Sequence, residues 1–146
     1  MPDLTFAVGP EGLSLPVLIG LDSTAAQVLV ARGAAIPRPQ LVRALVDTGS
    51  DLTAVSPQVL ANLGAKAGRV ARTYTAGGVV RTPTFYVSLS IPPPAGTPIP
   101  LLVVPRLRVT RLTFALPDLD VLIGLDVVLR YHLHIDGPGR TFTLSF

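Results

Sequence analysis

The chain has 146 residues with no cysteine and no tryptophan, and 49% of its residues are apolar while 14% are charged. This composition fits one domain whose hydrophobic core is large enough to fold without a disulfide or a bound metal ion. It excludes intrinsic disorder, a disulfide scaffold and a cysteine-based metal site. The net charge of +3 comes from arginines scattered singly with no aromatic-interleaved basic run, so we expect no nucleic-acid binding and assign these arginines to the solubilisation of strand faces.

Short apolar runs, separated by Pro and Gly, predict a mainly β protein. Gly77-Gly78 lies between two alternating segments and is predicted as a two-residue hairpin turn, because both positions tolerate a positive φ. Residues 136–139 are predicted to turn the chain between the last two strands. The predicted strands are Leu4–Val8, Leu15–Gly20, Gln40–Val46, Leu52–Val55, Arg69–Ala76, Val79–Ile91, Ile99–Val104, Arg108–Leu116, Val121–Ile123, Leu133–Ile135 and Arg140–Phe146.

Two short helices are predicted, and a third segment stays open. Residues 56–64 have a serine that can cap a helix, a proline at the first helical position and a glycine just past the end. Asp126–Tyr131 is predicted to be helical, with its acid at the positive N-terminal end. Asp22–Ala31 fits a helix, although its apolar centre fits a strand equally well.

The apolar excess does not predict a membrane span. A spanning helix needs about 20 consecutive apolar residues. The best runs, residues 98–104 and 121–125, are short and punctuated by Pro, Gly or Asp. The first residues lack the basic segment and apolar run of a secretory signal. We therefore expect a cytoplasmic protein.

The most informative stretch is Ala44–Val55, in which an apolar run enters Asp47-Thr48-Gly49 and a second apolar run leaves it. The tripeptide alone can be an ordinary turn. Further along, Val121–Gly124 forms an apolar-apolar-Gly segment before a predicted helix, and the glycine-tipped hairpin lies between the two motifs. In this order the motifs resemble the retropepsin-like aspartic proteases, especially the single-domain bacterial and retroelement-type members.

The resemblance covers residues 40–146 and implies a protease lobe. The expected fold is mainly β: a closed acid-protease-type barrel or sandwich with a flap hairpin and one or two short helices, one lobe per chain. Residues 1–39 are expected to form an N-terminal extension packed on the same domain. This extension can add strands, cover an interface or regulate the enzyme.

The family's chemistry needs two carboxylates. Carboxylates about 3 Å apart share one proton, so that one acts as general base on a water and the other as general acid. This chain has a single Asp-Thr-Gly, and the resemblance therefore implies a homodimer in which each subunit contributes Asp47. The implied activity is that of an aspartic endopeptidase acting on proteins or peptides, with no cofactor and no metal. The alternative is a catalytically silent retropepsin-fold module that dimerises or binds peptides.

The resemblance also suggests a reason for the low fraction of charged residues. An ordinary domain carries about 25% charged residues. We expect the uncharged surface of this chain to lie at a two-fold interface and in a peptide cleft.

The resemblance assigns roles to the catalytic loop. Thr48 matches the threonine whose hydroxyl reaches across the dyad and locks the two loops together, and Gly49 permits a tight backbone approach. Ser50 matches a position that hydrogen-bonds a catalytic carboxylate. A hydroxyl there favours the ionised form, which predicts an acidic pH optimum.

Asp51 departs from the retroviral pattern. The matching acid in those proteins pairs with an arginine just after the late glycine, but Leu125 stands at that position here. Asp51 can instead bind substrate backbone, cap a turn or pair with another arginine such as Arg130.

The flap and the supporting strand complete the predicted site. Gly77 and Gly78, with Ala76 beside them, match a flap tip, although a plain surface hairpin is the alternative. Tyr74 can lie over the substrate or pack on the sheet. The residues expected to support the catalytic loop without taking part in chemistry are Leu122, Ile123 and Gly124.

Two histidines alternate on one predicted strand. His132 and His134 therefore share a face, which makes a metal pair conceivable. A structural or solvent-exposed role is favoured, because the acids nearby are only Asp126 and Asp136.

Overall fold

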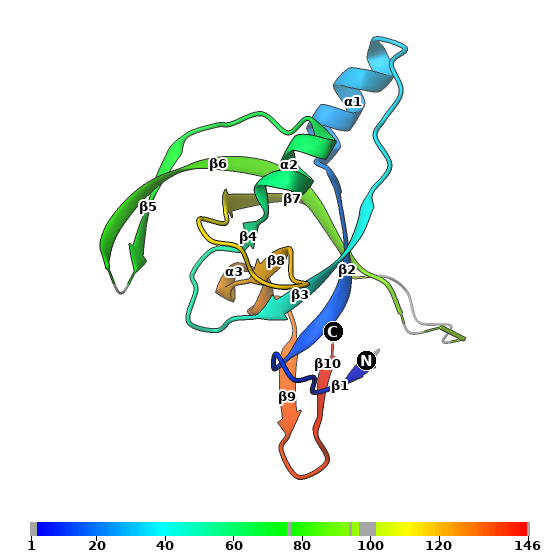
Figure 1. The fold of residues 1–146 in the computed structure, drawn as a ribbon. Helices are drawn as coiled ribbons and strands as arrows, with labels where there is room; N and C mark the ends of the chain where they lie inside the picture. Colours follow the sequence, from blue (N-terminus) through cyan, green and yellow to red (C-terminus); the bar gives the residue numbers. More distant parts are fainter. Residues whose placement is uncertain (1–2, 76, 94, 97–101, 146) are drawn as a thin grey trace.

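The computed structural model describes residues 3–75, 77–93, 95–96 and 102–145 (Figure 1). The chain is mainly β, with short helices between strands. The elements are β1 (Asp3–Ala7), β2 (Ser14–Leu21), α1 (Ser23–Ala31), β3 (Gln40–Val46), β4 (Ala54–Val55), α2 (Pro57–Leu63), β5 (Val70–Thr75), β6 (Gly78–Ile91), β7 (Leu102–Arg111), β8 (Val121–Ile123), α3 (Leu125–Val128), β9 (His132–Asp136) and β10 (Thr141–Ser145).

A closed barrel forms the body of the protein. Its strands follow the order β2-β3-β8-β4-β7-β6, and a second pairing of β2 with β6 closes the ring. Closure satisfies the ladder groups that an open sheet would leave at its edges. β5 is added outside the ring, where it pairs with the first half of β6 to form a long curved hairpin (Figure 1). The mainly-β closed barrel expected from the sequence is confirmed.

The first 39 residues contribute strands to both sheets of the described structure. β2 pairs with β3 and β6 inside the barrel. β1 pairs with β10 in a small sheet of order β1-β10-β9, which brings the two termini together (Figure 1). This sheet has its own apolar contact, since the rings of Phe6 and Phe142 stack with centroids 5.4 Å apart.

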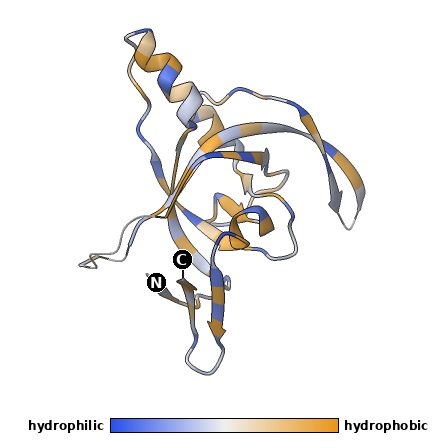
Figure 2. Cartoon of the chain, turned by 180° about the vertical axis from the view of Figure 1, so that it is seen from behind, coloured by the Kyte–Doolittle hydropathy of each residue, from blue (hydrophilic) through white to orange (hydrophobic). Residues whose placement is uncertain are grey.

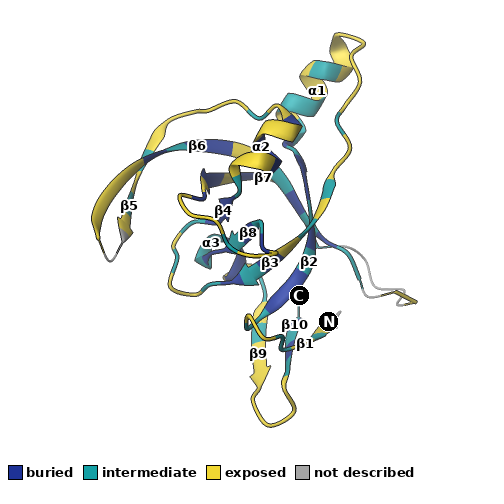
Figure 3. Ribbon diagram, viewed as in Figure 1, coloured by how far each residue is buried: buried dark blue, intermediate teal, exposed yellow. Residues whose placement is uncertain are grey.

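The core fills the barrel through the alternation of its strands. Successive side chains of a strand point to opposite faces, so every second residue turns inward. Val17 and Ile19 of β2 and Val87 and Leu89 of β6 are fully buried. Figure 3 shows the buried residues along the barrel strands, whereas the tip of the β5–β6 hairpin and much of α1 are exposed.

One strand replaces two predicted ones. The sequence predicted separate strands at Ile99–Val104 and Arg108–Leu116, but β7 runs continuously from Leu102 to Arg111. The pairing between β6 and β7 shifts register at Ser88, between the Leu89–Val104 and Val87–Leu107 pairs. Pro105 falls in this bulge, where a residue without an N–H is tolerated. Residues 97–101 lie outside the described part of the chain.

Two predicted boundaries near the site were also wrong. The predicted strand Leu52–Val55 is reduced to Ala54–Val55, because the amide of Thr53 bonds to a side chain rather than to a ladder. In the hairpin, Thr75 pairs with Gly78, so Gly78 begins β6 rather than forming the second turn residue as predicted. Gly78 has the positive φ, 115°, that glycine permits. Ala76 lies outside the described residues.

The predicted helices form, with one corrected cap. Residues 56–64 are as predicted: the Ser56 hydroxyl accepts from the Val59 amide, and Gly64 ends α2 with a φ of 66°. The open segment is helical, as α1. The last helix spans Leu125–Val128 rather than Asp126–Tyr131, and its N-cap, Gly124, has no side chain to offer.

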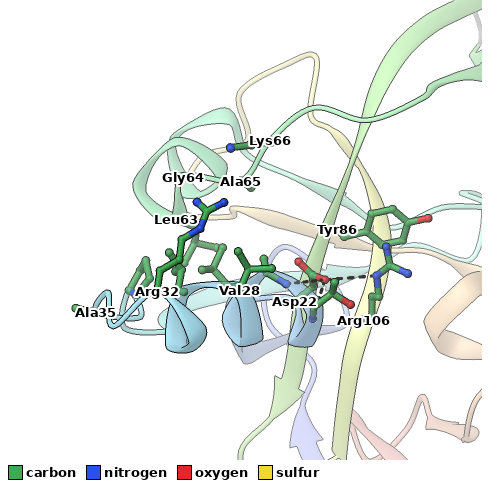
Figure 4. A pocket seen from close by; sticks show the side chains of 15 residues that line it. Asp22, Val28, Arg32, Ala35, Leu63, Gly64, Ala65, Lys66, Tyr86 and Arg106 are labelled. Carbon is green, nitrogen blue, oxygen red and sulfur yellow. Dashed lines mark hydrogen bonds and ion pairs between the residues drawn. The ribbon is translucent and has the colours of Figure 1, made fainter.

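α1 is anchored at its first turn. The Asp22 carboxylate accepts hydrogen bonds from the amides of Thr24 and Ala25 and lies 3.4 Å from the guanidinium of Arg106. That guanidinium stacks on the ring of Tyr86, 3.9 Å from its centroid (Figure 4). A cavity of about 560 Å³ lies beside this cluster, between α1 and the end of α2 (Figure 4).

The rest of α1 is poorly covered. None of its residues is buried, and it carries apolar side chains such as Val28 and Val30 (Figure 2). No helix among the described residues is long and apolar enough to span a membrane.

Candidate active site

Strand topology places the Asp47 loop. The loop joins β3 to β4, but these strands are not neighbours, because β8 lies between them, parallel to β3 and antiparallel to β4. The loop must therefore pass over the end of β8. The amide of Asp47 donates to the carbonyl of Ile123 at 2.8 Å, which continues the β3–β8 ladder up to the carboxylate itself.

Within the loop, the backbone turns tightly around Asp47. The Gly49 amide donates to Oδ1 of Asp47 at 3.0 Å, and the Ser50 amide donates to the Asp47 carbonyl at 3.2 Å. A Cβ at Gly49 would lie 3.2 Å from the same Oδ1, closer than ordinary contact. The half-buried carboxylate is thus oriented by the backbone of the loop, while Thr48 is exposed.

Gly124 allows the N-terminus of α3 to lie against the backbone of the Asp47 loop. A Cβ at this position would lie 2.6 Å from the carbonyl carbon of Leu52, which is backbone and cannot move aside. The next amides continue the contact: Leu125 donates to the carbonyl of Ser50 at 2.8 Å, and Asp126 donates to that of Asp51 at 3.2 Å. The loop and the start of α3 therefore form one hydrogen-bonded unit.

Asp126 and Thr53 hold this unit together, and sequence reasoning assigned neither of them to the site. The Asp126 carboxylate accepts from the Thr53 hydroxyl at 2.7 Å and from the Thr53 amide at 3.1 and 3.0 Å. The Thr53 hydroxyl oxygen in turn accepts from the Gly124 amide at 3.1 Å. Thr53 is fully buried. The sequence pattern indicates for Asp126 only a place at the helix N-terminus.

Ser50 does not make the contact that the resemblance implied, and Asp51 does not pair with an arginine among the described residues. The Ser50 hydroxyl donates to the carbonyl of Leu52 at 2.8 Å, rather than to the Asp47 carboxylate. Asp51 is exposed, and no ion pair joins it to an arginine in the described residues. Arg130, suggested as its partner, directs Nε to the carbonyl of Asp126 at 3.0 Å.

A cavity of about 300 Å³ opens above the loop and brings most of the predicted site together. Its floor includes Leu122, so this strand residue faces the cavity, while Ile123 is fully buried behind it. Tyr74 also lines the cavity and is 78% exposed. The lining residues are Asp47, Gly49, Ser50, Asp51, Leu52, Ala54, Arg72, Thr73, Tyr74, Val80, Thr82, Thr110, Arg111, Leu112, Thr113, Phe114 and Leu122.

The expectation of an uncharged cleft is wrong. Asp47, Asp51, Arg72 and Arg111 all line the cavity. Total charge is an average over the chain and carries no information about where the charges gather.

The remaining predicted residues lie outside this cavity. Gly77 and Gly78 are exposed at the end of the β5–β6 hairpin and do not line it. His132 and His134 are both exposed on β9. Within the described residues there is no cluster of three or more His, Asp or Glu side chains that could hold a metal ion.

A tyrosine hydroxyl is buried close to the Asp126 carboxylate. The Tyr131 hydroxyl has no hydrogen-bond partner in the part of the chain that is described. Burial, and to a smaller degree the charge of Asp126, raises the pKa of Tyr131 to about 12.

We expect Asp126→Ala to lower the free energy of unfolding by about 2–3 kcal/mol, because the buried Thr53 amide and hydroxyl lose their acceptor. Asp126→Asn keeps one acceptor oxygen and is expected to cost less. Urea denaturation measures both, with Asp3→Ala, an exposed acid at the start of β1, as the control. A cost for Asp126→Ala no larger than that of the control would contradict this role.

We expect the stability of the wild-type protein to fall as the pH rises from about 10 to about 12. The folded state holds the Tyr131 proton more tightly than the unfolded state, so its stabilising effect is complete below the ordinary tyrosine pKa and is lost through the raised one. Tyr131→Phe removes this contribution. Denaturation series at alkaline pH should show a shallower decline for the variant, and parallel declines would rule out the linkage.

Comparisons with known proteins identify the family and the fold. A sequence profile of the family described as "Aspartyl protease" matches residues 38–127, from β3 to α3. Comparison with curated proteins gives no match. Among solved structures, the chain is similar to a retropepsin-like aspartic protease from Rickettsia conorii, with a TM-score of 0.55 and 15% identity over 98% of this chain and 90% of that one. The chain belongs to the aspartyl protease family and has the retropepsin-like fold.

Proposed function

We propose that the protein is an aspartic endopeptidase that acts as a homodimer, with one Asp47 from each subunit. The observation that carries the proposal is the Asp47 carboxylate itself: it is fixed by the Gly49 amide and the β8 ladder, yet it faces a cavity. A carboxylate needed only for a turn would not require this opening.

The chemistry follows from two such carboxylates about 3 Å apart, which hold one proton between them. The ionised Asp47 removes a proton from a water, and the water oxygen attacks the carbonyl carbon of the scissile peptide bond. The protonated Asp47 gives its proton to the substrate. Collapse of the tetrahedral adduct then breaks the C–N bond as the leaving nitrogen receives a proton.

The dimer supplies what one chain lacks. The sequence contains one Asp-Thr-Gly, and the other carboxylate in the cavity, Asp51, comes from the same loop. Thr48 is exposed and makes no side-chain hydrogen bond within the described residues, so its hydroxyl is free to bond across a two-fold axis. Exposed apolar side chains near the small sheet, Leu129 and Ile135, are available for an interface.

A peptide substrate fits the cavity in an extended conformation. The β5–β6 hairpin overhangs the loop side of the barrel (Figure 1) and offers Thr73, Tyr74 and Val80 to the cavity. An extended peptide can add backbone hydrogen bonds beneath such a hairpin, while its side chains enter pockets. Gly77 and Gly78 at the hairpin end permit the opening that entry requires.

We expect cleavage of a denatured protein mixture with an optimum in the acidic range, because the dyad must keep one proton. Asp47→Asn should abolish cleavage, a loss of several orders of magnitude, since the amide can neither accept nor donate the proton. Peptide release measured against pH, for the wild type and Asp47→Asn, checks both expectations. Cleavage that survives the substitution would contradict the mechanism. A folded wild type that binds peptides without cleaving them would favour the silent binding module.

The dimer has a separate test. Sedimentation equilibrium of the wild type is expected to give the mass of two chains at the concentrations where cleavage is seen, and specific activity should fall on dilution. An active strict monomer would contradict the shared dyad. Gln27→Ala, at an exposed position of α1 away from the cavity, is a control that should change neither mass nor activity.

A further inference from the structure

The charges of the chain are distributed unevenly along the sequence. From Leu52 to Pro117 there is no Asp or Glu, yet this segment holds more than half of the 12 Lys and Arg residues. It includes β5, β6 and β7, and the residues of these strands that line the Asp47 cavity are called its wall: Arg72, Thr73, Tyr74, Val80, Thr82, Thr110 and Arg111. Among the charged residues of the described lining, the catalytic loop therefore contributes carboxylates, Asp47 and Asp51, whereas the wall contributes arginines, Arg72 and Arg111.

Two arginines of the wall reach the cavity. Arg72 is on β5, two residues before Tyr74, so the two side chains share a face of the strand. Arg111 is the last residue of β7. Both line the cavity that contains Asp47, and both are exposed, so their guanidinium groups are accessible to a bound peptide.

Among the described residues, neither arginine forms an ion pair with an acid. The ion pair found among the described residues joins Arg106 to Asp22, away from the cavity. Arg72 lies directly opposite Arg81 in the β5–β6 ladder, a like-charge pair that destabilises a hairpin. An acidic group entering the cavity would relieve this repulsion, and the guanidinium fork suits a carboxylate.

Asp51 is the group that would favour a basic rather than an acidic side chain in the ligand. It lines the same cavity and could attract a basic side chain. It belongs to the same loop as Asp47, however, whereas Arg72 and Arg111 come from two separate strands of the wall. Side chains that point toward the wall therefore meet positive charge.

We infer that the cavity selects peptides with Asp or Glu close to the scissile bond, and that Arg72 and Arg111 are the specificity-determining residues that pair with them. This inference rests on the proposed function in that the ligand is a peptide bound across Asp47. It assigns these two arginines a role beyond the solubilisation of strand faces.

Binding can be tested without cleavage. The probe is a set of fluorescein-labelled peptides with an apolar centre that carry Glu, Gln or Lys in turn at each outer position, titrated into Asp47→Asn protein and followed by anisotropy. The Glu peptides should bind roughly two- to fivefold tighter than their Gln counterparts at the best positions, the range of an exposed ion pair, and the difference should shrink at high salt. Equal binding of Glu and Gln peptides, tighter binding of Lys peptides, or no binding of any of them would overturn the inference.

Matched variants assign the effect to residues. Arg72→Gln and Arg111→Gln should each reduce the preference for Glu, and the double variant should abolish it. Arg108→Gln is the control: it is exposed on β7, like Arg111, but does not line the cavity. Circular dichroism checks that each variant is folded. A Glu preference that survives in the double variant, or that Arg108→Gln reduces equally, would overturn the assignment.

Cleavage by the wild type separates this inference from the proposed function. Acidic residues should be enriched within a few positions of the bonds cut in a denatured protein mixture. Cleavage without such enrichment overturns the inference but agrees with the proposed endopeptidase function. Selective binding of Glu peptides by a protein that cleaves none of its substrates supports the inference and contradicts the proposed endopeptidase function.

Discussion

The close contact between Gly124 and the backbone of the catalytic loop is the constraint on which the site depends. No side chain fits there, since a Cβ would lie 2.6 Å from the carbonyl carbon of Leu52. Only because the two backbones touch can the first amides of α3 bond to the loop carbonyls of Ser50 and Asp51. The orientation of Asp47 is therefore determined as much by a distant strand and helix as by its own loop.

Asp126 and Asp47 have different roles because their carboxylates have different surroundings. Asp126 accepts three hydrogen bonds from the buried Thr53, so its charge is used to join α3 to the loop. Among the described residues, the Asp47 carboxylate accepts one hydrogen bond, from the Gly49 amide, and Asp47 lines the cavity. A carboxylate whose acceptor positions are filled supports structure, whereas one with an open position can exchange a proton with water.

The features that sequence predicted correctly depend on near neighbours. The caps of α2, the strand before Asp47 and the Asp136 turn follow from residues within a few positions of one another. The features that it missed depend on residues far apart. The bulge that accommodates Pro105 needs β6 as partner, and the bond from Thr53 to Asp126 spans most of the barrel sequence. No local pattern distinguishes an acid that caps a helix from one that bonds to another segment.

Charge illustrates the same distinction between composition and position. The low charged fraction predicted an uncharged cleft, yet Asp47, Asp51, Arg72 and Arg111 meet in it. Uncharged surface lies instead on α1, whose sequence has no ionisable residue and whose residues are all at least partly exposed. A barrel can gather a few charges at one opening because its strands converge there from separate parts of the chain. Since Arg72 and Arg111 arrive on different strands, their proximity to Asp47 is a property of the topology, and so is any preference that they confer on the cleft.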